Sequence, residues 1–253
     1  MRVCFDHRQN VDSLEGAQAA LAVLFESRLP SSLLDIGCGS GSWLAAASGL
    51  GITDAWGMDG IDPPPDSMLP PSSTFKRQDL ALPWDLGRRF DAALCLEVAE
   101  HLPAAAAHRL VAAIARHTRL VYFSAACPGQ EGQHHIHCQW PAYWQSLFNG
   151  HGFVCDDRTR WKIWEDERIA WWYRQNLFSA HWEPDLAGRE PRIAPAVHPG
   201  MLAYATNRAS SLEFAAQVTR IEDGAMPLQW YAMTPLRAII GKLKRFRQSA
   251  DRT

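Results

Sequence analysis

The chain has 253 residues, of which 47% are hydrophobic and 21% charged, and its formal net charge is −2. A chain of this length and composition can bury a substantial core in one large domain, or in a domain with an extension. The small net charge provides no strong field to attract nucleic acid. No apolar run reaches the roughly 18 residues that a membrane span needs. We therefore expect neither a nucleic-acid partner nor a membrane span.

The cysteine pattern and the first ten residues indicate the cellular compartment of the protein. Six cysteines are scattered through the chain without a paired CxxC spacing, a pattern that favours reduced thiols over a disulfide framework. The opening MRVCFDHRQN is polar and contains no apolar segment typical of a secretory signal. Both observations predict a cytoplasmic protein.

The first predicted element is a helix that starts near Asp12. Asp12 is placed to cap it, Glu15 follows at the capping-box spacing, and apolar residues recur at helical spacing as far as Leu24. Beyond it, predicted strands lie in chain order within SLLDIG, DAWGMD, STFKRQDL, FDAALCLEVAEHL, RLVYFSAAC, FVCDDRTRW and RQNLFSAHW. Predicted helices between them lie within WLAAASGLG, PAAAAHRLVAAIARHT and WPAYWQSLFNGHG. The alternation predicts a doubly wound α/β fold with a seven-stranded, mostly parallel sheet, whose ligands bind at the carboxyl ends of the strands.

The pattern weakens after residue 182. A proline-rich loop is followed by two predicted tail helices, the second of which contains the basic run KLKRFR. We therefore divide the chain into a domain of residues 1–182 and a C-terminal extension of residues 183–253. The extension is interpreted as a cap, a dimer arm or a docking tail. A homodimer and a carrier-protein contact through the basic run are thus the partner hypotheses, although the run is also typical of a solvated helix end.

A glycine-rich turn follows the first predicted strand. Asp35, Gly37, Gly39 and Gly41 form a D-x-G-x-G-x-G pattern, in which the glycines allow a tight turn and a close approach of the backbone to a ligand. The spacing differs from the G-x-G-x-x-G of dinucleotide folds, and the Gly-Lys-Ser/Thr of a P-loop is absent.

Two acids follow at the ends of the next strands. Asp59 ends the second strand, where a carboxylate can bind both ribose hydroxyls, and Asp79 lies near the end of the third, where it can meet an adenine amino group. Either acid alone is typical of a solvated strand end. Together with the glycine turn they predict a nucleotide site.

These segments resemble the motifs of the class I S-adenosylmethionine-dependent methyltransferases. LLDIGCGSG, GMDG, RQDL and FDAALCLEVAEHL resemble the four motifs of that family in order, over about residues 12–182. More narrowly, VDSLEGA, EVAEHL, QWPAYWQSLFNGHGF, WWYRQNLF and VHPGM resemble a bacterial subgroup associated with polysaccharide or secondary-metabolite pathways. The resemblance implies the Rossmann-like methyltransferase fold and S-adenosylmethionine as the methyl donor.

The resemblance also implies roles for individual residues. Asp35, Gly37 and Gly39 would line the methionine moiety, and Asp59 would bind the ribose. Asp79 and Leu80 would hold the adenine, and Glu97 would face the reacting end of the cofactor. The cofactor-binding set is completed by Cys38 and Gly60.

Histidines supply the candidate bases for an oxygen nucleophile, because an imidazole titrates near neutral pH. His101 follows the fourth strand. His134, His135 and His137 lie in the loop after the fifth strand, where the subgroup usually has H-V-N-E-Q-W. His135 matches that pattern, while His137 and Cys138 replace an asparagine and a glutamate. The predicted catalytic residues are His135, His137, Glu97 and His101.

The loop also raises the question of a metal. A metal needs three or four convergent ligands. In an extended backbone His135 and His137 would share one side, and no paired motif supplies a further ligand. The loop is therefore interpreted as a polar lid or substrate loop, or as the site of a catalytic base, and no metal ligand set is assigned, with a metal kept as the less favoured alternative. Aromatic and polar residues that can extend the acceptor pocket, or simply pack in the core, are Tyr143, Trp144, Trp172, Tyr173 and Asn176.

The leading functional hypothesis is methyl transfer to an oxygen or nitrogen of a small molecule in a biosynthetic pathway. The alternative is a cyclase, in which the amino group of S-adenosylmethionine attacks its own γ-carbon to give azetidine-2-carboxylate and methylthioadenosine. Such an enzyme would need only a closed pocket. A non-catalytic partner subunit is disfavoured by the intact set of Asp35, Asp59 and Asp79.

Overall fold

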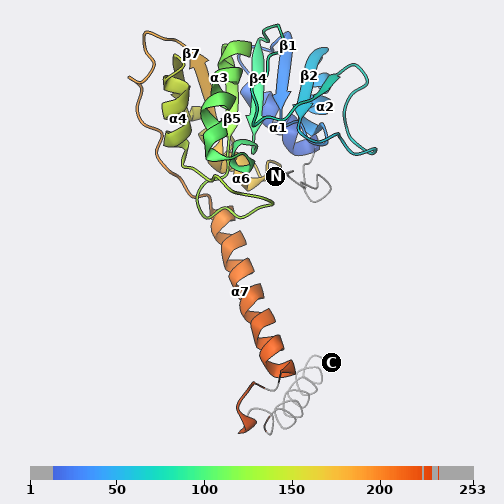
Figure 1. Ribbon diagram of the computed structural model, residues 1–253, viewed down its shortest axis with the longest axis vertical. Coiled ribbons are helices and arrows are strands. Elements are labelled where there is room, and N and C mark those ends of the chain that lie inside the picture. Colours follow the sequence, from blue (N-terminus) through green and yellow to red (C-terminus); the bar gives the residue numbers. More distant parts are fainter. Residues whose placement is uncertain (1–13, 224, 230–232, 234–253) are drawn as a thin grey trace, which may run out of the picture. The chain divides into compact units, whose positions relative to one another are not determined.

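A seven-stranded sheet forms the centre of the computed structural model, which describes residues 14–223, 225–229 and 233 (Figure 1). Its order is β3-β2-β1-β4-β5-β7-β6. All pairings are parallel except those of β7, which runs antiparallel to both β5 and β6. The predicted seven-stranded, mostly parallel sheet is confirmed. The strands are β1 (Ser32–Ile36), β2 (Asp54–Asp59), β3 (Thr74–Arg77), β4 (Ala92–Leu96), β5 (Leu120–Ser124), β6 (Phe153–Asp156) and β7 (Phe178–Trp182).

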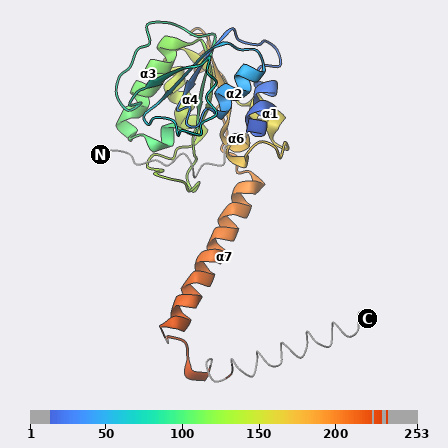
Figure 2. The same cartoon turned by 90° about the vertical axis from the view of Figure 1, so that its right-hand side faces the viewer.

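Helices cover both faces of the sheet. In Figure 2, α3 (Ala107–His117) and α4 (Pro141–Asn149) lie on one side, and α1 (Leu14–Leu24), α2 (Ser42–Gly49) and α6 (Trp171–Asn176) lie on the other. Every residue of β1 and β4 is buried, as expected for central parallel strands that are covered on two faces. Accordingly there are two apolar clusters, one around Phe123 and Phe148 and one around Leu21 and Leu44.

The edge of the sheet differs from the sequence prediction. The strand predicted within FVCDDRTRW ends at Asp156, and the helix α5 (Arg158–Ile163) begins two residues later. The cause is local, because the carboxylate of Asp156 accepts a hydrogen bond of 2.8 Å from the backbone N–H of Arg158, a turn that competes with strand extension. Similarly, the segment predicted as RQNLFSAHW starts in α6, and only its second half forms β7.

The chain divides into two compact units after Met201. The segment that follows β7 belongs to the first unit. Glu190 Oε1 accepts hydrogen bonds from Gln145 and Asn149 side chains and from the backbone of Cys155. These contacts fasten the segment to α4 and β6.

The second unit begins within α7 (Pro199–Glu222), whose side chains from Leu202 onward are almost all exposed. No helix in the described part of the chain is long and apolar enough to cross a membrane. The predicted cap Asp12 and the basic run at residues 242–247 lie outside the described residues.

Candidate active site

The glycine turn lies at the carboxyl end of β1, the strand that has β2 on one side and β4 on the other. Backbone N–H groups of Gly37 and Cys38 donate to the carbonyl of Met58, at 2.7 and 3.1 Å, and so fasten the turn to β2. Gly37 has a φ of 76°, and a Cβ there would lie 2.3 Å from Cγ2 of Val98. Only glycine therefore fits at this position.

Asp59 ends β2 beside the glycine turn. Its Oδ2 accepts a hydrogen bond of 3.0 Å from the N–H of Gly39, and its Oδ1 accepts one of 2.9 Å from Ile61. The predicted nucleotide-binding carboxylate is thus held rigidly against the turn.

The remaining predicted cofactor residues differ in exposure. Asp79 is exposed and accepts from the N–H of Ala81, while Leu80 is buried in the core. Cys38 is also buried, and burial together with the charges of Asp35 and Asp59 raises the pKa of its thiol far above the usual value. Any contact of Cys38 with a cofactor is therefore expected to come from its backbone. Gly60 shows no close contact that would exclude a side chain.

Glu97 follows β4 and takes part in a polar network across the strand ends. Its backbone has a φ of 55°, uncommon for a residue other than glycine. Its carboxylate accepts hydrogen bonds from Gln130 Nε2 at 2.7 Å and Asn176 Nδ2 at 3.2 Å, and Asn176 also donates to Gln130 Oε1 at 2.8 Å. Burial raises the pKa of Glu97, although the hydrogen bonds from Ser124, Asn176 and Gln130 oppose this. A strained backbone and a fixed carboxylate are typical of a functional position.

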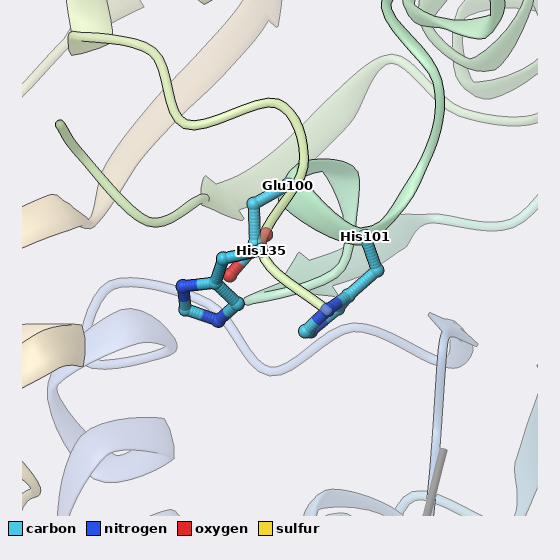
Figure 3. Close-up of side chains that lie close together, drawn as sticks. All are labelled: Glu100, His101 and His135. Atoms are coloured by element: carbon cyan, nitrogen blue, oxygen red, sulfur yellow. The ribbon is translucent and has the colours of Figure 1, made fainter. Parts of the chain in front are cut away.

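A short 3-10 turn, Ala99–His101, follows Glu97 and brings two more titratable residues to the same edge. The carboxylate of Glu100 is fully buried, and His101 is half-buried. The imidazole of His101 lies edge-on to that of His135, with 5.0 Å between ring centroids. Figure 3 shows Glu100, His101 and His135 gathered in one place from two segments of the chain.

The histidine loop is docked on this turn. Backbone N–H groups of Ile136 and His137 both donate to the carbonyl of Glu100 at 3.0 Å. The Nδ1 of His135 lies 2.8 Å from the carbonyl oxygen of Gln130. Since a carbonyl only accepts, Nδ1 carries the proton, and the lone pair is on Nε2.

The three loop histidines have different surroundings. His134 is exposed, with a φ of 53°. His137 is buried, and its ring lies against Tyr143 and Trp144, each at 5.3 Å between centroids. Burial lowers the pKa of His137. Within the loop, His135 is therefore the imidazole brought together with Glu100 and His101.

The predicted pocket residues fall into two groups. Asn176 joins the Glu97 network, as described above, and Tyr143 and Trp172 are partly buried. Trp144, which is 1% exposed, packs against Phe123 in the core, and Tyr173 packs edge-on against Trp43. The structure thus places Asn176 at the site and Trp144 and Tyr173 mainly in the packing beneath it.

Sequence reasoning missed Gln130 and Glu100. Gln130 supports both Glu97, through its side chain, and His135, through its backbone carbonyl. It lies in the loop CPGQEGQ, where nothing in the sequence distinguishes it from a surface glutamine. Glu100 could have been noticed, because the segment EVAEH places a second acid three residues after Glu97.

The chain matches the family model described as a methyltransferase domain over residues 7–179, more than half of its length. A solved sugar N-methyltransferase, KedS8 from Streptoalloteichus sp ATCC 53650, is 19% identical. The match covers 70% of this chain and 91% of that one, with a TM-score of 0.51, and it supports the fold.

Two further solved structures are similar. DesVI of Streptomyces venezuelae is 18% identical, with 66% of this chain and 91% of that chain covered and a TM-score of 0.47. The magnesium protoporphyrin IX methyltransferase ChlM from Synechocystis PCC 6803, solved with bound S-adenosylmethionine, is 22% identical, with 66% and 79% covered and a TM-score of 0.47. No curated protein matches the chain.

The residues present fit the nucleotide cofactor of this family. The glycine turn admits a close approach, the carboxylate of Asp59 is hydrogen-bonded beside it, and the Glu97 carboxylate is fixed at the adjacent strand end. The family match covers all of these positions. The chain belongs to the methyltransferase-domain family, the class I S-adenosylmethionine-dependent methyltransferases.

Proposed function

We propose that this methyltransferase transfers the methyl group of S-adenosylmethionine to an oxygen or nitrogen of a small molecule in a biosynthetic pathway. The observation that carries the proposal is the juxtaposition of two kinds of group at one edge of the sheet. The glycine turn and Asp59 lie at the ends of β1 and β2, and the Glu97 network and His135 lie at the ends of β4 and β5. Ligands of open α/β sheets bind in this crevice.

The cofactor side is proposed to follow the family motifs. Asp59 would accept hydrogen bonds from the ribose hydroxyls, and Asp79 and Leu80 would hold the adenine. The methionine moiety would lie along Asp35 and the glycine turn and reach Glu97. S-adenosylmethionine supplies a methyl group already activated on a sulfonium, so the chain's contribution is mainly to position the reacting groups.

The acceptor side is proposed to centre on His135. The carbonyl of Gln130 fixes its Nδ1–H, which leaves Nε2 as the Lewis base of a neutral ring that packs against His101. An oxygen acceptor must lose its proton as it is methylated, and a lone pair on a fixed imidazole can take part in that step. His101 and His137 are proposed to position this group, because the first contacts its ring and the second anchors the loop.

A small acceptor agrees with the neighbours whose names state a substrate. KedS8 is a sugar N-methyltransferase, and ChlM acts on magnesium protoporphyrin IX. The pocket is proposed to be extended by Tyr143, Trp172 and Asn176, with Trp144 and Tyr173 packed behind them. A homodimer, a carrier-protein contact and a cytoplasmic location remain predictions from the sequence. The comparisons give no support to the cyclase alternative.

The test separates these reactions by their products. The full chain is incubated with S-adenosylmethionine, alone and with sets of sugar, phenol and amine acceptors, and the mixtures are analysed by mass spectrometry. S-adenosylhomocysteine formed only with an acceptor, together with a product heavier by one methylene, supports the proposal. Methylthioadenosine formed without an acceptor would contradict it. So would a failure of S-adenosylmethionine to bind in calorimetry.

A further inference from the structure

Three side chains at the acceptor side offer ligand atoms to one point. One oxygen of Glu100 and one ring nitrogen each of His101 and His135 all lie within 4.8 Å of one another (Figure 3). In a bound shell with ligands about 2.1 Å from the ion, such atoms lie about 3 to 3.5 Å apart. Side-chain adjustments of about an ångström would therefore close the shell. Two imidazoles and one carboxylate are a set that divalent transition-metal ions bind in proteins.

The carboxylate of Glu100 is fully buried beside that of Glu97. Its oxygens lie near the backbone amides of Glu100 and Ala126 and near the side chain of Glu97, although no contact meets full hydrogen-bond geometry. No ion pair found among the described residues includes Glu97 or Glu100. Two adjacent buried carboxylates are costly to ionise unless a positive charge lies beside them.

The hydrogen bonds of His101 and His135 are also typical of histidines that bind a metal ion. A ligating histidine usually donates its other ring N–H to a carbonyl or carboxylate, which fixes the tautomer. His135 does this through Nδ1 to the carbonyl of Gln130. His101 likewise forms hydrogen bonds with the backbone of His134 and Gln133, which hold its ring in place.

The loop backbone leaves room for the His135 ring at one glycine. A Cβ on Gly132 would lie 2.3 Å from Nε2 and 2.4 Å from Cε1 of His135. Any side chain at position 132 would thus displace the ring. Glu97 stays outside the ligand set, because its oxygens already accept hydrogen bonds from Gln130 and Asn176.

We propose that Glu100, His101 and His135 bind a divalent first-row transition-metal ion whose open positions hold the acceptor oxygen. This inference rests on the proposed function for its chemical role and favours the metal that the sequence interpretation disfavoured. The acceptor hydroxyl loses its proton to solvent on binding the ion, which lowers its pKa. The oxygen then uses a lone pair to form a bond to the methyl carbon while the sulfur–methyl bond breaks. The electron pair of the broken bond stays on the sulfur, which becomes a neutral thioether. With the ion bound, His135 acts as a metal ligand in place of the direct base proposed above.

The first test measures metal binding without reference to activity. Tag-free full chain, stripped with a chelator and then freed of it, is titrated with MnCl₂, with free Mn²⁺ followed by electron paramagnetic resonance, and with ZnCl₂ in a calorimeter. One ion per chain is expected. Glu100→Gln and His135→Ala should each weaken binding by about a hundredfold or more, and Gly132→Ala, which keeps all three ligands, by about ten- to a hundredfold.

Two controls identify adventitious binding. His134→Ala and Cys138→Ser alter neighbouring side chains outside the ligand set and should bind the ion like the unchanged chain. Retained folding is checked by circular dichroism and S-adenosylmethionine binding. If Glu100→Gln fails to fold, the metal affinities of His135→Ala and Gly132→Ala decide the question. The metal site is overturned if no saturable site is found, or if binding in the loop variants equals that in the controls.

The role of the ion in methyl transfer is tested separately from the binding of S-adenosylmethionine. The metal-free chain should bind S-adenosylmethionine normally yet lose methyl transfer to a hydroxyl acceptor, and added Mn²⁺ or Zn²⁺ should restore the transfer. Full transfer by the metal-free chain would overturn the role. Failure of the proposed function is distinguishable, because it appears as absent S-adenosylmethionine binding whether or not the ion binds.

Discussion

Asn176 and Glu97 are 79 residues apart in the chain, yet Asn176 Nδ2 donates to Glu97 Oε1 at 3.2 Å. Glu97 directly follows β4, while Asn176 is the last residue of α6. The same amide nitrogen donates to Gln130 Oε1, so one buried side chain joins three segments at the carboxyl edge of the sheet. The network therefore couples the cofactor side to the loop that carries His135.

Asn176→Ala should destabilise the protein by about 1–3 kcal/mol, because it leaves buried oxygens of Glu97 and Gln130 without a donor. The free energy of unfolding is measured with urea. Asn207→Ala, at an exposed position of α7, is the matched control and should change the stability by less than about 0.5 kcal/mol. Equal effects of the two substitutions would show that the network contributes nothing to stability.

Asp59→Ala should weaken S-adenosylmethionine binding by about 1.5–3 kcal/mol, measured by isothermal titration calorimetry, because charge-assisted hydrogen bonds to the ligand are lost. The substitution also removes the acceptor for the N–H groups of Gly39 and Ile61. Asp62→Ala is the control. That acid is exposed and pairs with Arg77, so its loss should leave the affinity unchanged. Unchanged affinity in Asp59→Ala would refute the ribose assignment.

His135→Ala should lower kcat by about a hundredfold or more, because the group at the acceptor is lost. The affinity for S-adenosylmethionine should hardly change, since its proposed contacts lie at the ends of β1, β2 and β4 and after β3, outside the loop of His135. Single-turnover kinetics with an acceptor found by the product assay measure the first quantity, and calorimetry measures the second. His134→Ala should match the unchanged chain. A normal kcat in His135→Ala would exclude a catalytic role for this residue.

Sequence patterns predicted the sheet well because its signals are local. Fully apolar runs such as Ala92–Leu96 are typical of covered parallel strands, and this one ends where the acidic residue Glu97 follows. The sixth strand is shorter than the segment FVCDDRTRW in which it was predicted, because one hydrogen bond at Asp156 decides the backbone there. Such short competitions between a strand and a turn leave no periodic signal.

The candidate site also has a part that local sequence patterns predict and a part that they do not. The glycine turn and Asp59 depend on the ends of adjacent strands, and the family resemblance placed them correctly at one edge. Whether they bind the cofactor remains a prediction. The sequence distinguishes the loop histidines only by strand alternation and by the subgroup pattern, whereas the backbone contacts of Glu100 with residues 136 and 137 assign each imidazole a different environment. No sequence pattern contains those contacts, because they depend on how two loops dock.

Gly37→Ala should destabilise the protein by more than the cost of its backbone conformation alone. A non-glycine residue in the left-handed region costs about 1–2 kcal/mol, and here the added methyl group would also meet Val98 at 2.3 Å. Gly51→Ala is the matched control, because Gly51 has a φ of +93° but no atom within 4 Å of its Cβ position. The difference in unfolding free energy between the two variants therefore measures the steric contact.

A second substitution tests the cause of that difference. In Gly37→Ala/Val98→Ala the contact is relieved while the backbone cost remains, so part of the lost stability and of the lost S-adenosylmethionine affinity should return. Val98→Ala alone supplies the fourth corner of the double-mutant cycle. If the double variant is as unstable as the sum of the single variants, the close approach of the turn to Val98 is not the reason that glycine is needed at position 37.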